Sequence, residues 1–372
     1  MTSAAMGAPQ SGATVSPNTS TPSKIHPATS HPANDAQARK RAARFWAERT
    51  APYKDPSVAR SIGQLASTLG PLLGLIVLMA LTLKVGYWLT LLLAVPAALF
   101  LARLWILQHD CGHGAFFKSG KANDWVGRVL GVITVTPYEM WRRDHAIHHA
   151  TSGNLDKRGT GDIDTLTVRE YLALSPFKRF TYRLYRHPLV LFGLGPTFLF
   201  LWKFRFPLGD QVRDVKAWVS VLTTNAMIIG LLALFAAAFG IAPVLKVWLP
   251  VVLIAATIGI WMFYVQHQFE TVYWRHEPEW DFHEAAVHGC SFYDLPGWLH
   301  WMTAYVGYHH VHHLASRVPN YRLRDCHRSI PELQNVRSIS LKDSLKTVRL
   351  ALFDEESRRL IGFRELRAMG VA

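Results

Sequence analysis

The sequence has few cysteines and few acidic residues. Its three cysteines, Cys111, Cys290 and Cys326, are an odd number without a framework spacing, which excludes a disulfide-stabilised scaffold and predicts reduced thiols. Only 26 residues are acidic against 40 basic ones, so the net charge is +14. No recognised nucleic-acid-binding motif accompanies this charge, and we expect no nucleic-acid partner. The first residues contain no apolar core before a cleavage site, and we expect no signal peptide.

Apolar residues make up 50% of the chain and are bunched into long runs, which is the pattern of an integral membrane protein. Stretches of about 20 apolar residues are long enough to cross a bilayer. We predict four spans in two hairpins, at residues 61–84, 87–107, 218–240 and 247–266. The apolar run Pro188–Trp202 is short and is broken by Gly and Pro, so we expect an interfacial or re-entrant piece there.

Basic residues set the expected orientation. They are concentrated in residues 109–217 and 268–372, whereas the links within the two hairpins hold only Lys84 and Lys246. Because cytoplasmic loops carry the excess of Lys and Arg, both termini should be cytosolic, and the basic face could attract anionic lipid head groups and an acidic redox partner. We expect an integral protein of a bacterial cytoplasmic membrane.

Histidines form three tight clusters just outside the predicted spans. Residues three and four apart share one face of a helix, so each cluster presents several imidazoles in one direction. Neutral imidazole binds iron, copper, zinc and nickel, and eight rings exceed what one ion can use. The sequence therefore predicts two metal ions. The eight residues are His109 and His113 in HDCGH, His145, His148 and His149 in HAIHH, and His309, His312 and His313 in HHVHH.

Four blocks, HDCGHGAFF, WRRDHAIHHA, VQHQFE and GYHHVHHLASRVPNYRL, resemble the membrane fatty acid desaturases. The third histidine box and the WDFHEAAVHG to SFYDLPG stretch are most similar to the omega-6 (Δ12) acyl-lipid branch. The resemblance covers roughly residues 40–340. It implies a non-haem di-iron centre held by the eight box histidines, O₂ as co-substrate, and an external electron donor, either a ferredoxin or a b-type cytochrome. The substrate would be an acyl-lipid or an acyl-thioester.

The resemblance also implies a ninth histidine ligand outside the boxes. His267, at the cytosolic end of the fourth predicted span, is the first choice because an unpaired polar group there would be costly; His288 is the second. His310 lies off the register of its box and is interpreted either as a residue behind the metal ligands or as structural. Carboxylates orient metal-bound imidazoles in such sites. The candidates are Asp110, Asp144, Asp162, Asp164, Asp281 and Glu284. Aromatic residues that either line an acyl tunnel or anchor the chain at the interface are Trp141, Trp261, Tyr264, Trp274 and Trp301.

Three other functions share part of this pattern. A sister di-iron hydroxylase or carotenoid ketolase would keep the iron site but oxygenate its substrate. A membrane redox carrier would bind haem between histidines facing each other across spans. A zinc protease would need a Glu where HDCGH has Asp110. The sequence leaves the double-bond position, the acyl carrier and the oligomeric state open.

The expected fold class is an all-α integral membrane protein with a cytosolic helical cap that carries the histidine site. Residues 1–45, rich in Ser, Thr, Pro and Ala, are predicted to be a disordered tail. The desaturase domain is expected over residues 46–340, followed by a cytosolic helical tail over residues 341–372.

Overall fold

The structure is a computed structural model that describes residues 32–370. The chain divides into two compact units, residues 1–40 and 41–372, and helix α1 (Pro32–Thr50) crosses the boundary between them. Its sequence is rich in Ala and Arg, which both favour helix. In the structure, residues 32–45 of the predicted tail are helical. The rest of that prediction, residues 1–31, lies outside the described residues.

Four helices among the described residues are long and apolar enough to cross a membrane. They coincide with the four predicted spans and form the two predicted hairpins. Many of their large apolar side chains, including Leu73, Val77, Ile229 and Leu234, are exposed on the protein surface, which suits contact with lipid. The protein is therefore an integral membrane protein. The four helices are α2 (Val58–Thr82), α3 (Tyr87–Gly112), α9 (Val215–Phe239) and α10 (Ile241–His267).

Between α3 and α9 the chain forms short helices that cover the histidine end of the spans. Ser119 and Ser175 cap two of them by accepting backbone N–H bonds, and Thr167 forms a full capping box with Glu170. The elements are α4 (Gly120–Ile133), α5 (Tyr138–Thr151), β1 (Leu166–Thr167), α6 (Val168–Ala173), α7 (Pro176–Tyr185), the π-helical turn η2 (Val190–Leu194), α8 (Gly195–Leu201), η3 (Lys203–Arg205) and η4 (Gly209–Arg213).

The apolar run Pro188–Trp202 lies in a bent pair of helical stretches, Pro176–Tyr185 and Val190–Arg213, with an angle of 60° between them. Just before the run, Arg186 donates to Gln268 at the end of α10, at 3.1 Å. Just after the pair, Asp214 accepts from Arg143 of α5, at 3.2 Å. Both contacts lie at the histidine end of the spans. The apolar run therefore begins and ends at the histidine end of the spans, as expected of a re-entrant piece.

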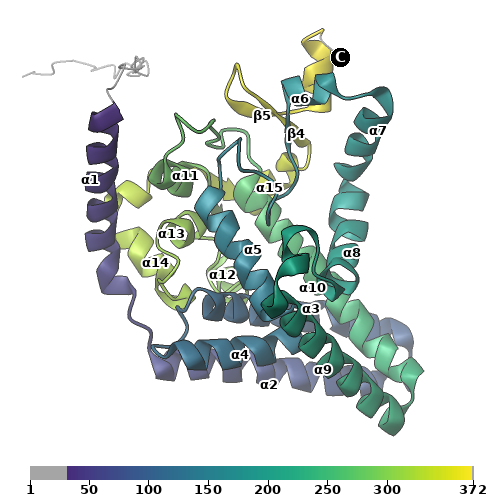
Figure 1. Ribbon diagram of the computed structural model, residues 1–372. Helices are drawn as coiled ribbons and strands as arrows, with labels where there is room; N and C mark the ends of the chain where they lie inside the picture. Colours follow the sequence, from purple (N-terminus) through teal and green to yellow (C-terminus); the bar gives the residue numbers. More distant parts are fainter. Residues whose placement is uncertain (1–31, 371–372) are drawn as a thin grey trace, which may run out of the picture. The chain divides into compact units, whose positions relative to one another are not determined.

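After α10 the chain stays at the histidine end, and Figure 1 shows α11, α13 and the strands β4 and β5 on the opposite side from the turn between α9 and α10. The predicted all-α class is confirmed, since the strands are few and short. The elements are α11 (Phe282–His288), β2 (Phe292–Asp294), α12 (Gly297–Met302), α13 (His309–Leu314), α14 (Asn320–Ser329), η5 (Pro331–Leu333), β3 (Ser338–Ser340), α15 (Leu341–Thr347), β4 (Leu350–Asp354), β5 (Arg359–Gly362) and α16 (Phe363–Ala368).

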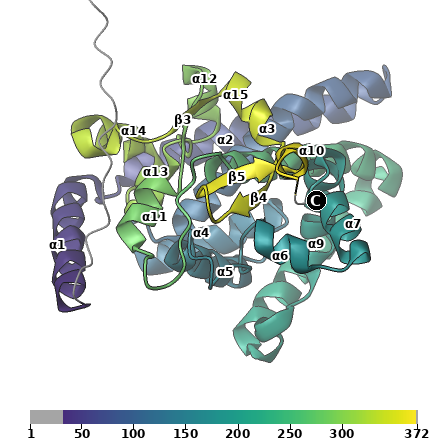
Figure 2. The same ribbon diagram turned by 90° about the horizontal axis from the view of Figure 1, so that it is seen from above.

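The C-terminal segment differs from the predicted helical tail over residues 341–372, because it contains two strands. β4 pairs antiparallel with β5 and parallel with β1, and the neighbouring β2 and β3 form a separate parallel pair. Figure 2 shows β4 and β5 side by side between α13 and α6. Leu352 and Ile361 pack in one cluster with Tyr171, and Leu360 packs in the main core, so both faces of the hairpin are buried. Through β4, the C-terminal segment therefore binds β1, the strand that follows the second histidine box.

Candidate metal centre

The first of two histidine groups gathers residues from three helices. His109 lies in the last turn of α3 and His113 at its C-cap, His145 and His149 lie on α5, and His312 lies on α13. One ring nitrogen from each residue lies within 4.8 Å of all the others. The Nε2 atom of His149 is 3.1 Å from that of His145 and 3.0 Å from that of His312. Five imidazoles therefore converge on one point.

The second group forms around the end of α10. His267 is the last residue of that helix, and its Nε2 atom lies 2.9 Å from Nε2 of His309 and 3.2 Å from Nε2 of His148. His313 and Cys290 also place a donor atom in this group. Four imidazoles converge here.

Each H-x-x-H-H box contributes to both groups. In α5, His145 and His149 face the first group, and His148 faces the second. In α13 the roles are exchanged, because His309 and His313 face the second group and His312 the first. Residues four apart share a helix face, whereas the residue between them points to a neighbouring face. The two helices therefore hold the two groups side by side.

Burial keeps these imidazoles neutral. It lowers the pKa of His113, His145, His149, His309, His312 and His313 well below the usual histidine value, and neighbouring histidines lower each pKa further. A neutral imidazole is the form that binds a metal ion. The Nε2 atoms of His113 and His313 are buried without a hydrogen-bond partner, and such orphaned atoms need an explanation such as an ion.

The spacing of the facing nitrogens fits metal coordination. Two imidazole nitrogens that each lie ~2.1 Å from one ion, at right or tetrahedral angles, are about 3.0 to 3.4 Å apart. The observed Nε2 to Nε2 distances of 2.9 to 3.2 Å lie close to the lower end of this range. All-nitrogen donor sets of this kind suit iron, copper, zinc or nickel. The residues therefore fit two ions, one in each group.

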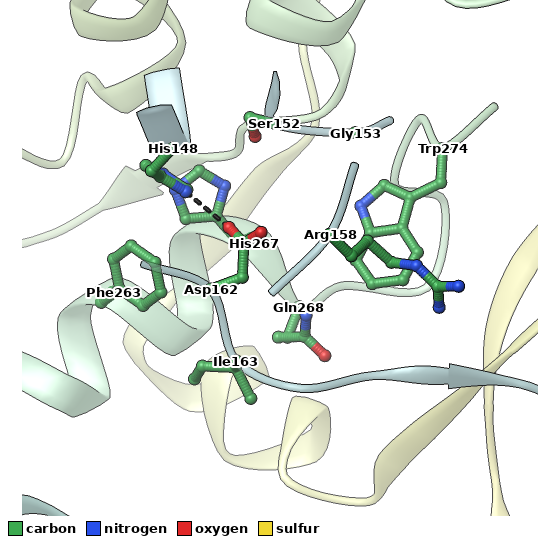
Figure 3. Close-up of a pocket in the computed structure, with 10 residues that line it drawn as sticks. All are labelled: His148, Ser152, Gly153, Arg158, Asp162, Ile163, Phe263, His267, Gln268 and Trp274. Carbon is green, nitrogen blue, oxygen red and sulfur yellow. Dashed lines mark hydrogen bonds and ion pairs between the residues drawn. The ribbon is translucent and has the colours of Figure 1, made fainter. Parts of the chain in front are cut away.

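Two of the six candidate carboxylates lie behind box histidines. Asp162 Oδ1 is 2.6 Å from Nδ1 of His148, and Figure 3 shows the carboxylate directed at that ring beside His267. Asp110 Oδ1 lies 3.4 Å from Nδ1 of His109 but makes no hydrogen bond with it, and its other oxygen accepts from the backbone N–H and side-chain amide of Asn320, both at 2.8 Å. A carboxylate at the second ring nitrogen fixes the orientation of a ligand histidine.

The other four candidates have different partners. Asp144 bonds to Gln211, and Asp281 caps the start of α11. The backbone N–H of Asp164 donates to Tyr185, and Glu284 pairs with His288. None of these four contacts reaches a histidine of either group.

The structure separates the two candidates for the ninth histidine. His267 is buried in the second group, whereas His288 is exposed on α11 and lies 3.7 Å from Glu284. His310 faces away from both groups and meets His327, with Nε2 of the first ring 3.0 Å from Nδ1 of the second. The sequence does not indicate that Cys290 would join the second group, because nothing marks this cysteine apart from the other two.

A cavity of about 940 Å³ reaches both groups, since it is lined by His109 and His145 of the first and by His309 of the second. Its walls are apolar side chains of α3, η2, α8 and α10, and its polar part includes Arg143 and Lys203. This volume lies at the upper end of that of small-molecule sites. The cavity therefore suits a long apolar ligand that passes beside the histidines.

A second, much smaller void adjoins the other side of the second group. It has a volume of about 20 Å³ and is lined by His148, His267, Asp162, Arg158 and Gln268 among others (Figure 3). A polar void of this size holds a single water molecule. It is too small for an acyl chain, which leaves the large cavity as the candidate substrate site.

Two of the five aromatic candidates line one of these spaces. Trp141 lines the large cavity and stacks on the ring of His145, with centroids 4.7 Å apart, and Trp274 lines the small void. Trp261, Tyr264 and Trp301 are not among the described residues that line either space. Tyr264 instead donates to the carbonyl of Thr347, at 2.8 Å.

Two groups of histidines at the ends of apolar spans, open to a long apolar cavity, define a membrane enzyme that acts on a lipid-like chain. The fatty acid desaturase family model matches residues 86–338. A fatty acid desaturase of Bacillus subtilis (strain 168) is 45% identical over 325 residues, covering 87% of this chain and 92% of its own. The chain therefore belongs to the fatty acid desaturase family and is an enzyme with that activity.

Two relatives from Synechocystis sp. carry more specific names. The sn-1 acyl-lipid omega-3 desaturase (ferredoxin) is 27% identical over 275 residues, which are 73% of this chain and 74% of the relative. The sn-1 oleoyl-lipid 12-desaturase is 26% identical over 233 residues, which are 61% and 64% of the two chains. These matches confirm the resemblance seen in the histidine boxes.

Proposed function

We propose that this enzyme binds two iron ions and uses O₂ to introduce a cis double bond into the acyl chain of a membrane lipid. The observation that carries the proposal is the division of nine buried or half-buried histidines into two groups beside one apolar cavity. His109, His113, His145, His149 and His312 would hold one ion. His148, His267, His309 and His313 would hold the other.

The bound iron pair would supply the redox chemistry that removes hydrogen from an unactivated methylene, which acid–base side chains alone cannot do. The overall reaction takes –CH₂–CH₂–, O₂, two electrons and two protons to –CH=CH– and two water molecules. The chain's own residues have two tasks. Asp162 holds the His148 ring in one orientation, and the apolar walls with Trp141 hold the acyl chain beside the histidines and exclude water.

The distribution of basic residues supports a cytosolic active site. The segments at the histidine end carry most of the Lys and Arg residues, whereas Lys84 and Lys246 belong to the opposite ends of the hairpins. Both termini would then be cytosolic, in the cytoplasmic membrane of a bacterium. The name of one Synechocystis relative includes both an acyl lipid and ferredoxin, which supports lipid-linked chains and a separate electron donor.

For the double bond we propose the Δ12 (omega-6) position, on the resemblance of the third histidine box and on the 12-desaturase relative. The test is gas chromatography and mass spectrometry of fatty acids from a host with and without the gene. The host is fed either a saturated or a Δ9-monounsaturated chain. A new Δ12 bond in the monounsaturated chain is expected. A new bond in the saturated chain would overturn the position but keep the desaturase activity, and oxygenated products would favour a hydroxylase.

The metal assignment has its own test in the same host. Replacing His148, His312 or His313 singly by Ala should abolish the unsaturated product and lower the iron content, without preventing membrane insertion. His288→Ala is the matched control, because this histidine is exposed and outside both groups. Retained product in all three variants would refute the ligand assignment, and stoichiometric zinc together with activity would refute iron.

A further inference from the structure

We infer that the face formed by α14 and the His327 ring is where a reduced, acidic iron–sulfur protein docks and passes electrons to the second histidine group. This inference rests on the proposed function, because it presupposes a reaction that consumes two electrons. The face is formed by the exposed side chains of Arg324, Arg328 and Arg337 around half-buried His327.

A contact chain leads inward from this face. The His327 ring lies between the surface and buried His310, and the facing nitrogens of these two rings are 3.0 Å apart. His310 is directly bonded along the backbone to His309, whose Nε2 atom is 2.9 Å from that of His267. Two rings and one peptide link thus connect the surface with the second group. Electron transfer through protein weakens steeply with distance, so a short bonded route of this kind favours this face.

Aromatic packing holds the outer ring of the route in place. His327 stacks on Phe292 with ring centroids 5.2 Å apart and an interplanar angle of 27°, and Phe292 stacks on Tyr308 at 4.7 Å. Tyr308 immediately precedes His309 in the chain. The alternative roles for His310 and His327 are weaker, because neither ring belongs to the metal groups and neither lines the large cavity.

The positive charge of the face favours an acidic partner. Residues 317–342 contain six Arg and Lys residues and two carboxylates, Asp325 and Glu332. Glu332 is already paired with Arg49 at 3.0 Å, and Asp325 lies 3.9 Å from Arg324. The guanidinium of Arg324 lies over the Tyr305 ring, at 5.5 Å, on the same side as the aromatic stack. A surface of this sign steers an acidic partner and repels a basic one.

The position of α14 keeps the face accessible beside the membrane. Asn320 at its start is bonded to Gln64, and Tyr321 accepts from the backbone N–H of Ser57 at 2.7 Å, so the helix starts next to the first turn of α2. It therefore lies on the histidine side of the spans. Each docking event delivers one electron and leaves the carrier oxidised, and two events supply the two electrons of one turnover.

The test uses the purified full-length enzyme with iron and lipid substrate, and a plant-type [2Fe–2S] ferredoxin with its reductase and NADPH as the probe. The variant Arg324→Glu/Arg328→Glu should raise the KM for ferredoxin at least tenfold and flatten its dependence on salt. Product formation driven by dithionite and methyl viologen should be retained. The matched control is Arg364→Glu/Arg367→Glu, which makes the same charge change on exposed residues of α16.

A second variant tests the inner route. His327→Phe keeps the aromatic stack but removes the nitrogen that meets His310, so it should lower kcat with ferredoxin several-fold at unchanged KM. Equal ferredoxin KM values for the α14 and α16 variants would overturn the docking face. Rapid turnover with cytochrome b₅ and none with ferredoxin would overturn the partner class. An unmodified enzyme that is inactive with the chemical reductant would instead overturn the proposed function.

Discussion

His148 has the best-defined environment of the box histidines. One ring nitrogen faces His267 across 3.2 Å, and the other is held by Asp162 at 2.6 Å. The loop that carries Asp162 comes close to α5 at Gly161. Its φ of +74° is a conformation that L side chains rarely adopt, and an added Cβ atom would lie only 3.1 Å from the His148 Cβ. Asp162 is therefore held behind the ring by a backbone shape that glycine permits.

Replacing Asp162 by Asn should keep the fold but loosen the His148 ring. We expect iron affinity or product yield to fall by about 10- to 100-fold, the usual cost of losing a carboxylate behind a ligand histidine. The measurement is iron content and fatty acid product of the purified variant. Asp281→Asn is the control, because the side chain of Asp281 caps the start of α11. Unchanged values for the Asp162 variant would contradict the positioning role.

Cys290 lies in the second group without being suited to bind its ion. Its sulfur is 3.8 Å from Nδ1 of His267, which is the ring nitrogen opposite to the one that meets His148 and His309. Burial raises the pKa of this thiol well above its usual value, so the thiolate that metals require is disfavoured. We expect Cys290→Ala to retain iron and His267→Ala to lose about half of it, as measured by metal analysis. Loss of iron in the Cys290 variant would make the sulfur a ligand.

At the scale of elements, a glycine in α4 allows this helix to pack closely against the start of α5. A Cβ atom on Gly127 of α4 would lie 2.2 Å from the ring of Tyr138, which begins α5. Tyr138 is fully buried, so its ring has little room to move. The close approach of these two helices positions the second histidine box next to the end of α3.

Gly127→Ala should therefore destabilise the protein by ~1–3 kcal/mol, the usual cost of overpacking. Gly74→Ala is the matched control, because no atom lies within 4 Å of the Cβ position on α2. Thermal unfolding in detergent, followed by circular dichroism, should show a lower midpoint for the Gly127 variant and an unchanged or slightly higher one for the control. Equal midpoints would show that α4 and α5 can move apart.

The sequence predicts the four spans because long apolar runs are visible in it. The histidine clusters are visible in it because their spacing is local. It does not predict that each H-x-x-H-H box serves both groups, since this depends on how α5 and α13 face each other. It also misses Arg103, which is buried within α3, donates to Thr68 and to the carbonyl of Trp301, and lies over the Trp301 ring. Pairing of β4 with β1 joins residues far apart in the chain, and no local pattern encodes it.

At the scale of the whole molecule, the enzyme gathers neutral histidines in a protein with a strongly positive net charge. Six histidines of the centre, at positions 113, 145, 149, 309, 312 and 313, have a pKa held well below the usual value by burial. In the unfolded chain the same side chains titrate near ~6.5. Below that pH the unfolded state binds protons that the folded state does not, so stability is lost as the pH falls.

Protein stripped of metal with a chelator should therefore unfold at a clearly lower temperature at pH 5 than at pH 7.5. Iron-loaded protein should show a smaller difference until the protons displace the ions. The measurement is the unfolding midpoint of both forms across this pH range in one detergent. A midpoint of the stripped form that does not change between pH 7.5 and pH 5 would contradict the buried, neutral state of these rings.

The pairing of β1 with β4 has a consequence for biosynthesis. β4 begins at Leu350, whose carbonyl accepts from Arg186, and it lies against the segment that follows Asp162. A ribosome produces this strand only after all nine imidazoles have been made. A nascent polypeptide can therefore insert its hairpins early, but the surroundings of His148 are completed only after β4 has been synthesised.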